Sequence, residues 1–212
     1  DSIKKQSFQD YEIIVADAGS KDKTIEIARQ YGCGIVKGGL PGRGRNEGAK
    51  AAKGDIFLFI DSDAILPAGF LEKSVKEFNQ KNVKVVSFGL KPASPKLFFK
   101  ILFSVYNFIL GILPFAGMVI LTTKDFYERL GGFDESIKLG EDSDYLLRAK
   151  KMKNWAMLRS IFVYISPRRF EKQGYLKTTR QYILGGLHML FLGPIKSGFP
   201  DYKFDIYSKK EK

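Results

Sequence analysis

The stretch GDIFLFIDSD, residues 54–63, decides the fold that we expect for this chain. Its run of apolar residues predicts a buried strand that ends at Asp61. Side chains at positions i and i+2 of a strand point the same way, so Asp61 and Asp63 are expected to face one site. Two carboxylates there can bind a hard divalent cation and leave positions open for a phosphorylated substrate. A solvated acidic turn is the alternative for an isolated Asp-x-Asp.

Strands and helices alternate through the first half of the chain. Strands are predicted at 12–16, 35–36 and 54–60, and helices at 24–31 and 46–53. This alternation favours an α/β fold with a mostly parallel, Rossmann-like sheet flanked by helices. Ligands of such sheets bind beyond the carboxyl ends of the strands, which is where Asp17 and Asp61 are expected.

The second half of the chain is less regular. Strands are predicted at 83–88 and 161–165, and helices at 126–130, 142–151 and 176–192. Residues 101–121 contain no charged side chain, and a bilayer is spanned by about 20 apolar residues. This segment fits three interpretations: a membrane span, a surface that contacts lipid, or packed core. The apolar stretch 182–195 could add a second membrane contact.

The charge balance narrows the classes of partner. Lysine and arginine outnumber aspartate and glutamate by 35 to 23, a formal net charge of +12. This excess favours nucleic acid, acidic lipid head groups or phosphorylated substrates, and it also fits a plain basic surface. The aromatic residues follow core periodicity, so we expect no nucleic-acid binding. The single Cys33 excludes an intramolecular disulfide and, with a polar N-terminus that lacks a signal peptide, predicts a cytoplasmic location.

Two motifs in the first half each have two interpretations. Asp17 can accept a hydrogen bond from a pyrimidine N–H or a ribose hydroxyl, or it can serve as a turn residue. The glycine-rich segment 38–46, with Arg43 and Arg45, can cradle a phosphate or form a flexible surface loop. It is not a dinucleotide fingerprint, because Glu47 occupies the position of the third glycine.

The second half adds candidates for catalysis and charge neutralisation. Glu141 or Asp142 could be a general base for a hydroxyl nucleophile, or both could stabilise a helix N-terminus. Asp144, two residues further on, is expected to face elsewhere. His188, the only histidine, is either a metal ligand or a packed helix residue. Arg169 and its neighbour either clamp a diphosphate or are surface charges at a strand exit.

Taken together, three segments in this order resemble the family 2 glycosyltransferases, which have the GT-A fold. EIIVADAGSKDKT (12–24) is similar to the nucleotide-binding strand and turn of that family. GRGRNEGAKAAKGDIFLFIDSDAILP (42–67) is similar to its Arg-Asn helix and Asp-x-Asp strand, and ERLGGFDESIKLGEDSDYLLR (128–148) to its acceptor segment. The resemblance implies a GT-A-type sheet with apolar C-terminal helices.

The resemblance also implies a division of the chain and a set of roles. One domain over 1–207 would combine a nucleotide-sugar-binding half (1–90) with an acceptor-side half (91–207), followed by a basic tail (208–212). Asp17 would contact the nucleobase, and Asp61 the ribose or a metal-bound water. The implied site residues are Asp17, Arg43, Asn46, Asp61 and Arg169 for substrate, Asp63, Asp61 and His188 for metal, and Asp142 and Glu141 for catalysis.

The reaction implied is an inverting, single-step transfer of one sugar that depends on Mg²⁺ or Mn²⁺. The donor would be a UDP- or GDP-linked sugar and the acceptor a hydroxyl, with a lipid-linked acceptor and a peripheral position on the inner face of the cell membrane as one option. No Gln-x-x-Arg-Trp motif occurs, so a processive synthase is not expected.

Two departures from the family pattern affect the nucleotide site. The chain starts at Asp1, downstream of the first strand and the Pro-x-x-Asn-Glu-like turn of the family, so one edge of the site is expected to be missing. Ala18 stands where the family often has an acidic residue. A nucleotidyltransferase and a non-catalytic nucleotide-sugar-binding fragment are therefore kept as alternative functions.

Overall fold

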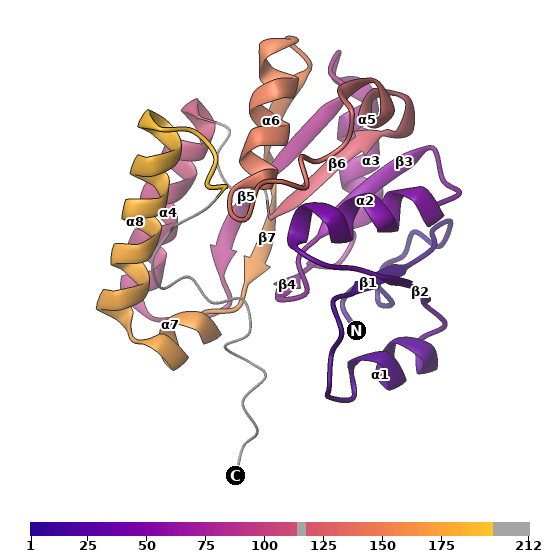
Figure 1. The fold of residues 1–212 in the computed structure, drawn as a ribbon, viewed down its shortest axis with the longest axis horizontal. Helices are drawn as coiled ribbons and strands as arrows, with labels where there is room; N and C mark the ends of the chain where they lie inside the picture. Colours follow the sequence, from indigo (N-terminus) through magenta and orange to yellow (C-terminus); the bar gives the residue numbers. More distant parts are fainter. Residues whose placement is uncertain (114–117, 197–212) are drawn as a thin grey trace.

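The computed structural model describes residues 1–113 and 118–196, which form seven strands and eight helices (Figure 1). The strands are β1 Ile14–Asp17, β2 Gly34–Lys37, β3 Ile56–Ile60, β4 Ala64–Ile65, β5 Val85–Pro92, β6 Val119–Thr123 and β7 Trp155–Ile165. The helices are α1 Thr24–Gln30, α2 Pro41–Ala51, α3 Phe70–Gln80, α4 Leu97–Ile112, α5 Lys124–Leu130, α6 Glu141–Lys151, α7 Arg168–Gln173 and α8 Tyr175–Phe191.

The main sheet has five strands in the order β3-β6-β5-β7-β4. β5 and β7 are parallel, whereas β6 runs antiparallel to both of its neighbours, β3 and β5. β3, β5 and β7 therefore share one direction, and β4 and β6 run against it. The predicted α/β class with flanking helices is confirmed, but the sheet is mixed rather than mostly parallel. Apolar patterning predicts that a strand is buried and carries no information about its direction.

Both faces of the main sheet are covered by helices, as the strand patterns require. Neighbouring residues of β6 point to opposite faces, so Leu121 packs in a cluster with Phe70 of α3 and Phe99 of α4. Ile120 instead packs with Phe126 of α5 in a second cluster, which also contains Tyr145 of α6. The carboxyl end of β3 is thus fixed between two well-packed layers.

β1 and β2 form a separate, parallel two-stranded sheet. Among the described residues, β1 pairs only with β2, and β3 pairs only with β6. The small sheet is attached to the rest of the molecule through α2 and through the N-terminal segment, whose buried Gln6 donates to the Pro67 carbonyl at 3.0 Å.

The predicted glycine-rich loop is the point at which the sequence interpretation was wrong. Residues 41–51 form helix α2, which begins with Pro41 in its first turn, a position that suits proline. The glycines allow close packing, because Gly42 lies against the backbone of Asp134 and Gly44 against Ala16. Arg43 and Arg45 are therefore helix residues with fixed directions.

The apolar segment 101–121 is divided between two structural elements. Its first part belongs to α4, its last part to the buried strand β6, and residues 114–117 lie outside the described residues, as does the predicted tail at 208–212. The core interpretation is confirmed for β6, whereas one side of α4 is exposed. Within residues 1–113 and 118–196, no helix has the length and hydropathy to cross a membrane.

Candidate active site

An arginine joins the two halves of the chain at the carboxyl end of β3. Arg45 of α2 donates from Nη2 to Asp61 Oδ1 at 2.7 Å, and its Nη1 forms an ion pair with Glu141 Oε1 at the start of α6. The arginine side chain is 12% exposed and that of Glu141 only 6%. Phe133 adds a ring 5.4 Å from the guanidinium carbon. We call Arg45, Asp61 and Glu141 the α2–α6 seam.

The charges of this seam influence one another strongly. Burial alone would lower the pKa of Arg45, but the carboxylates of Asp61, Glu141 and Asp142 outweigh it and raise that pKa above its usual value. Burial raises the pKa of Asp61 to about 6, an effect that Arg45 opposes and that the Asp142 and Asp63 carboxylates reinforce. Burial and the adjacent Asp142 likewise raise the pKa of Glu141. Several carboxylates thus surround the buried guanidinium of Arg45.

Asp63 and Asp142 have free carboxylate oxygens beside this seam. The half-buried Asp63 side chain has no hydrogen bond or ion pair within residues 1–113 and 118–196, and its backbone carbonyl accepts from Ser166 at 3.3 Å. Within the same residues, Asp142 accepts hydrogen bonds through Oδ1 alone, including one from the Ser143 N–H at 2.7 Å. Both side chains contribute to the charge around Asp61. The Asp-x-Asp and Glu-Asp motifs, which are far apart in the sequence, therefore lie close together in the structure.

The donor atoms of this cluster have the chemistry that Mg²⁺ and Mn²⁺ require, namely carboxylate oxygens with few competing partners. In the part of the chain that the structure describes, however, no three histidine, cysteine, aspartate or glutamate side chains are arranged to hold a metal ion. His188 lies in the last turn of α8 and is not brought together with Asp61 and Asp63 into such a group. Asp61 and Asp63 would therefore hold a divalent cation together with oxygen atoms of a bound phosphate. A site in which protein side chains supply all the ligands does not fit the described residues.

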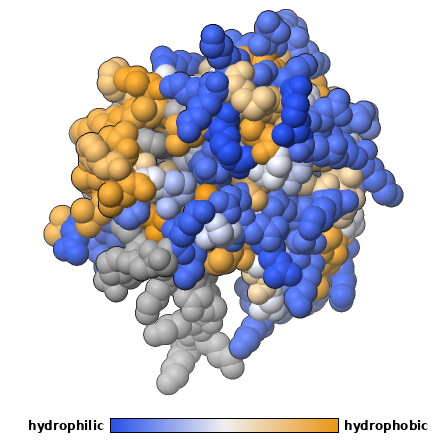
Figure 2. Space-filling model, turned by 45° about the horizontal axis from the view of Figure 1, so that its top comes forward, coloured by the Kyte–Doolittle hydropathy of each residue, from blue (hydrophilic) through white to orange (hydrophobic). Residues whose placement is uncertain are grey.

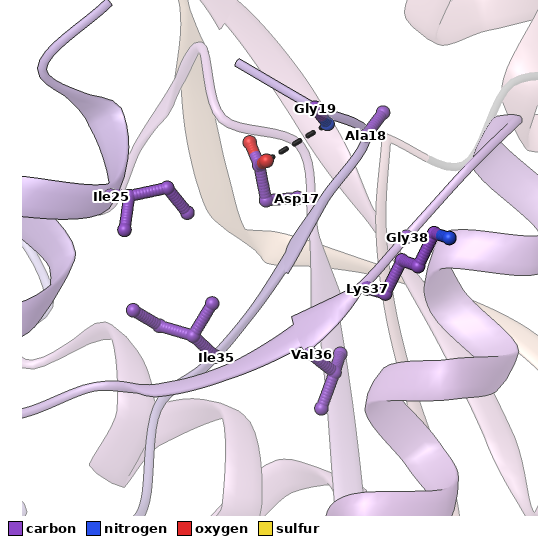
Figure 3. Close-up of a pocket in the computed structure, with 8 residues that line it drawn as sticks. All are labelled: Asp17, Ala18, Gly19, Ile25, Ile35, Val36, Lys37 and Gly38. Atoms are coloured by element: carbon purple, nitrogen blue, oxygen red, sulfur yellow. Dashed lines mark hydrogen bonds between the residues drawn. The ribbon is translucent and has the colours of Figure 1, made fainter. Parts of the chain in front are cut away.

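A pocket of about 340 Å³ opens at the carboxyl ends of β1 and β2 (Figure 3). Ile25, Ile35 and Val36 give it apolar walls, and Asp17 and Lys37 supply charge. The Asp17 carboxylate is turned toward Gly19, whose N–H donates to it at 2.8 Å. Hydrogen bonds from Ser20 and Gly19 lower the pKa of Asp17, so it is ionised at neutral pH. Asp17 has the turn role considered for it and still lines a pocket.

Two further predicted site residues lie on α2, one buried in the core and one exposed at the surface. Asn46 is buried, and its amide is fully used: Oδ1 accepts from Tyr127 and Phe133, and Nδ2 donates to Phe133 and Glu135. These bonds use every side-chain donor and acceptor of Asn46, so the substrate contact expected of it stays a prediction that would require one of them to break. Arg43 is exposed on the same helix.

Arg169 lies at the start of α7, directly after β7. The end of β7 is held beside the Asp-x-Asp turn, since Ser166 bonds to the Asp63 carbonyl and Ile165 pairs with Ala64. Arg169 therefore lies three residues after Ser166, the point at which the chain leaves the Asp63 turn, and its role at a diphosphate stays a prediction. Asp144 faces elsewhere, as expected, and forms an ion pair with Arg148 at 2.8 Å.

Sequence reasoning missed the central role of Arg45. The sequence placed Arg45 in a loop that would either bind phosphate or be flexible at the surface, whereas Arg45 lies in α2 and pairs with two carboxylates. The pattern that could have indicated this is helical: Arg45 is three residues after Gly42 and four before Ala49, which are both buried. An arginine on the small-residue face of a helix needs an anionic partner nearby.

The chain is similar to known proteins in both sequence and structure. The model of a family described as glycosyl transferase family 2 matches residues 1–132. An uncharacterized glycosyltransferase of Rickettsia typhi is 29% identical over 163 residues, which cover 68% of this chain and 51% of the relative. The poly(ribitol-phosphate) beta-N-acetylglucosaminyltransferase TarS of Staphylococcus aureus is 25% identical over 70% of this chain and 29% of its own length. This chain thus spans about half or less of these curated relatives.

Solved structures show the same fold. The mannosyltransferase PcManGT of Pyrobaculum calidifontis, in complex with GDP-Man and Mn²⁺, has a TM-score of 0.71 at 21% identity and covers 93% of this chain and 59% of its own. TarS residues 1–349 in complex with UDP have a TM-score of 0.59 at 20% identity, covering 80% of this chain and 56% of that one. At these identities the likeness extends to the fold alone.

Proposed function

The chain belongs to glycosyl transferase family 2, and we propose that it transfers one sugar from a nucleoside-diphosphate sugar to a hydroxyl acceptor, with a divalent metal and with inversion. The observation that carries this proposal is the convergence of Asp61, Asp63 and Asp142 on the α2–α6 seam. The structural neighbours named above are complexes with UDP and with GDP-Man and Mn²⁺, which supports the same donor class here.

The donor would bind along a path fixed by α2. The base and ribose would enter the pocket beside Asp17, where apolar walls and an ionised carboxylate suit a planar ring with an N–H donor. Ala16, next to Asp17, packs against Gly44, and the following residue, Arg45, pairs with Asp61. Two consecutive residues of one helix therefore relate the nucleobase pocket to the carboxylates.

Asp63, with Asp61, would hold the metal at the diphosphate. When bound, Mg²⁺ or Mn²⁺ offsets the negative charge of the departing nucleoside diphosphate. Asp63 is the better ligand of the two, because its carboxylate has no competing partner among the described residues, whereas Asp61 already binds Arg45. Arg169, three residues after Ser166, whose N–H donates to the Asp63 carbonyl at 3.3 Å, would add positive charge near the leaving group.

Asp142 would act as the general base. It would take the proton of the acceptor hydroxyl while that oxygen bonds to the anomeric carbon and the bond to the diphosphate breaks on the opposite face. What favours Asp142 over Glu141 is access: Glu141 is buried and paired with Arg45, whereas Asp142 is half-buried and its Oδ2 has no partner among the described residues. Glu141 would position the helix that carries the base. A lipid-linked hydroxyl is the acceptor class that we favour.

Calorimetric titration of UDP and of GDP, each with and without Mn²⁺, tests this proposal. Wild type should bind one of the two nucleotides in a metal-dependent way, and Asp63→Ala should abolish that binding. Asp55→Ala, an exposed aspartate beside the opposite end of β3, is the matched control and should bind like wild type. Failure of wild type to bind either nucleotide would contradict the proposal, and pyrophosphate release from a nucleoside triphosphate and a sugar phosphate would favour a nucleotidyltransferase instead.

A further inference from the structure

Helices α4 and α8 lie at the edge of the molecule farthest from the small sheet (Figure 1). Both expose large apolar side chains to solvent. On α4 the exposed apolar positions include Leu97, Ile101, Val105, Phe108 and Ile112, spaced by three or four residues so that they form one stripe. Phe108 is 72% exposed. The opposite side of the helix packs into the core through Phe99 and Phe103, so the exposed stripe takes no part in core packing.

Helix α8 continues this surface. Its exposed apolar residues include Leu176, Ile183, Leu187 and Phe191, again at helical spacing. The two helices are held side by side at their N-terminal ends, where the Phe99 and Tyr175 rings lie 5.5 Å apart. Figure 2 shows hydrophobic residues gathered over this part of the molecule, while most of the remaining visible surface is hydrophilic. We call the combined surface the α4–α8 face.

The charges on the α4–α8 face have one sign. Neither helix contains an aspartate or glutamate, whereas the exposed Lys100, Lys177 and Arg180 lie in their N-terminal halves. Lys96, just before α4, donates to the Tyr175 hydroxyl at 2.9 Å and adds a further cation at the same end. The Tyr175 hydroxyl raises the pKa of Lys96, and Glu171 of α7 is close enough to add to this effect. An apolar stripe bordered by lysine and arginine complements the anionic head groups and acyl chains of a bilayer surface.

The α4–α8 face is also continuous with the acceptor side of the site. Met189 of α8 packs against Gly140, the residue before Glu141. Beyond α8, Ile195 exchanges backbone hydrogen bonds with Leu139 at 3.2 Å. A flat surface that contacts this face would therefore lie next to residues 139–140, which lead into Asp142, the proposed general base.

We propose that the α4–α8 face docks this protein on an anionic lipid bilayer, with α4 and α8 lying in the plane of the interface. Neither helix, at 16 and 17 residues, is suited to span the membrane. This inference goes beyond the proposed function, because adsorption to lipid requires no donor, metal or turnover. It also gives a physical reason for a lipid-linked acceptor, which such docking would place beside Asp142.

Vesicle co-sedimentation of the full chain tests the docking. Wild type should sediment with vesicles of phosphatidylcholine and phosphatidylglycerol, should do so much less with pure phosphatidylcholine, and should be released by added salt. Phe108→Glu with Leu187→Glu should lower the partition coefficient roughly tenfold or more, because large apolar side chains are lost from the interface. Both sites are exposed, so folding should persist, as circular dichroism would check.

Matched variants separate the possible outcomes. Ile27→Glu on α1 replaces an apolar side chain that is 49% exposed, close to the 47% of Leu187, and should leave vesicle binding unchanged. Lys100→Glu with Lys177→Glu should weaken binding to the anionic vesicles only. The proposal would be overturned if wild type bound neither kind of vesicle. It would also be overturned if the Phe108→Glu, Leu187→Glu variant and the Lys100→Glu, Lys177→Glu variant bound anionic vesicles like wild type.

A second copy of the chain is the competing occupant of this face. Light scattering that shows a dimer dispersed by Phe108→Glu, together with no vesicle binding, would assign the face to self-association and overturn the proposal. Titration of nucleotide with Mn²⁺ on the same samples keeps this result separate from the proposed function. Variants that lose vesicle binding but keep nucleotide binding would show that the face and the donor site act independently.

Discussion

The α2–α6 seam and the α4–α8 face both depart from the usual arrangement of apolar side chains inside and charged side chains outside. The seam buries an arginine and a glutamate between packed helices, whereas the face leaves large apolar side chains in water. Both arrangements are costly to a folded protein, the first through desolvation and the second through exposed hydrocarbon. The seam satisfies its buried charges internally, while the face has no described partner within the fold. This difference separates a site that is completed by the chain itself from one that needs an external surface.

The largest effect is expected from the carboxylate beside the seam. Asp142→Asn should lower turnover about 10³-fold, because the amide cannot accept the acceptor proton. The measurement is release of UDP or GDP from UDP-GlcNAc or GDP-Man, with nucleotide binding followed in parallel and expected to stay within about twofold of wild type. Asp144→Asn is the control, since Asp144 pairs with Arg148 away from the site. Equal activity of Asp142→Asn and wild type would remove Asp142 from the base role.

Breaking the seam itself should cost stability. Arg45→Ala leaves Glu141 buried without its cation, and we expect the free energy of unfolding in urea to fall by about 3 kcal/mol. Arg43→Ala, an exposed arginine two residues earlier on the same helix, should change it by less than about 0.5 kcal/mol. A similar loss for both arginines would mean that helix α2, rather than the ion pairs, is responsible.

The pH dependence of stability should show that burial outweighs ion pairing at Glu141. Its pKa in the folded state is raised above the usual 4.5, so the folded state holds this proton more tightly than the unfolded state. The folded state therefore loses relative stability as pH rises from about 4.5 through the raised value. Wild type should lose about 1 kcal/mol more than Glu141→Gln across that window in urea titrations at each pH. A difference that grows in favour of wild type would mean that Arg45 dominates instead.

The smallest effect is expected on the α4–α8 face. Phe108→Ser should change the free energy of unfolding by less than about 0.5 kcal/mol, because the side chain is already in water. Phe103→Ser, on the buried side of the same helix, should cost about 3 kcal/mol in the same urea experiment. Substantial destabilisation by Phe108→Ser would indicate that part of the fold covers this face and would weaken the comparison.

Local patterns predicted the elements well where one physical rule decided them. The apolar run before Asp61 is β3, and the helices expected at 24–31, 126–130 and 176–192 are α1, α5 and α8 to within two residues. The strand expected at 161–165 is longer and begins at Trp155, because residues 155–158 pair with β5. The periodic spacing of apolar residues within a short stretch of chain is enough to predict such elements.

Long-range partners account for what the sequence could not predict. Arg45 and Glu141 are 96 positions apart, so no local pattern relates them. The glycines of α2 suggested a loop, and only their packing against Asp134 and Ala16 explains a helix there. Hydropathy likewise identified 101–121 as apolar without showing which side of α4 the core would leave uncovered.

The separation of β1 and β2 from the main sheet has a consequence for how the molecule fluctuates. A two-stranded sheet has little stability of its own, and this one is attached through α2 and the N-terminal segment rather than through shared strands. Its amide hydrogens should therefore exchange with solvent sooner than those of β5, which is paired on both sides. Because Asp17 sits at the end of β1, a nucleotide in the adjacent pocket would slow that exchange, and the protected amides would map the ligand's position without any assay of transfer.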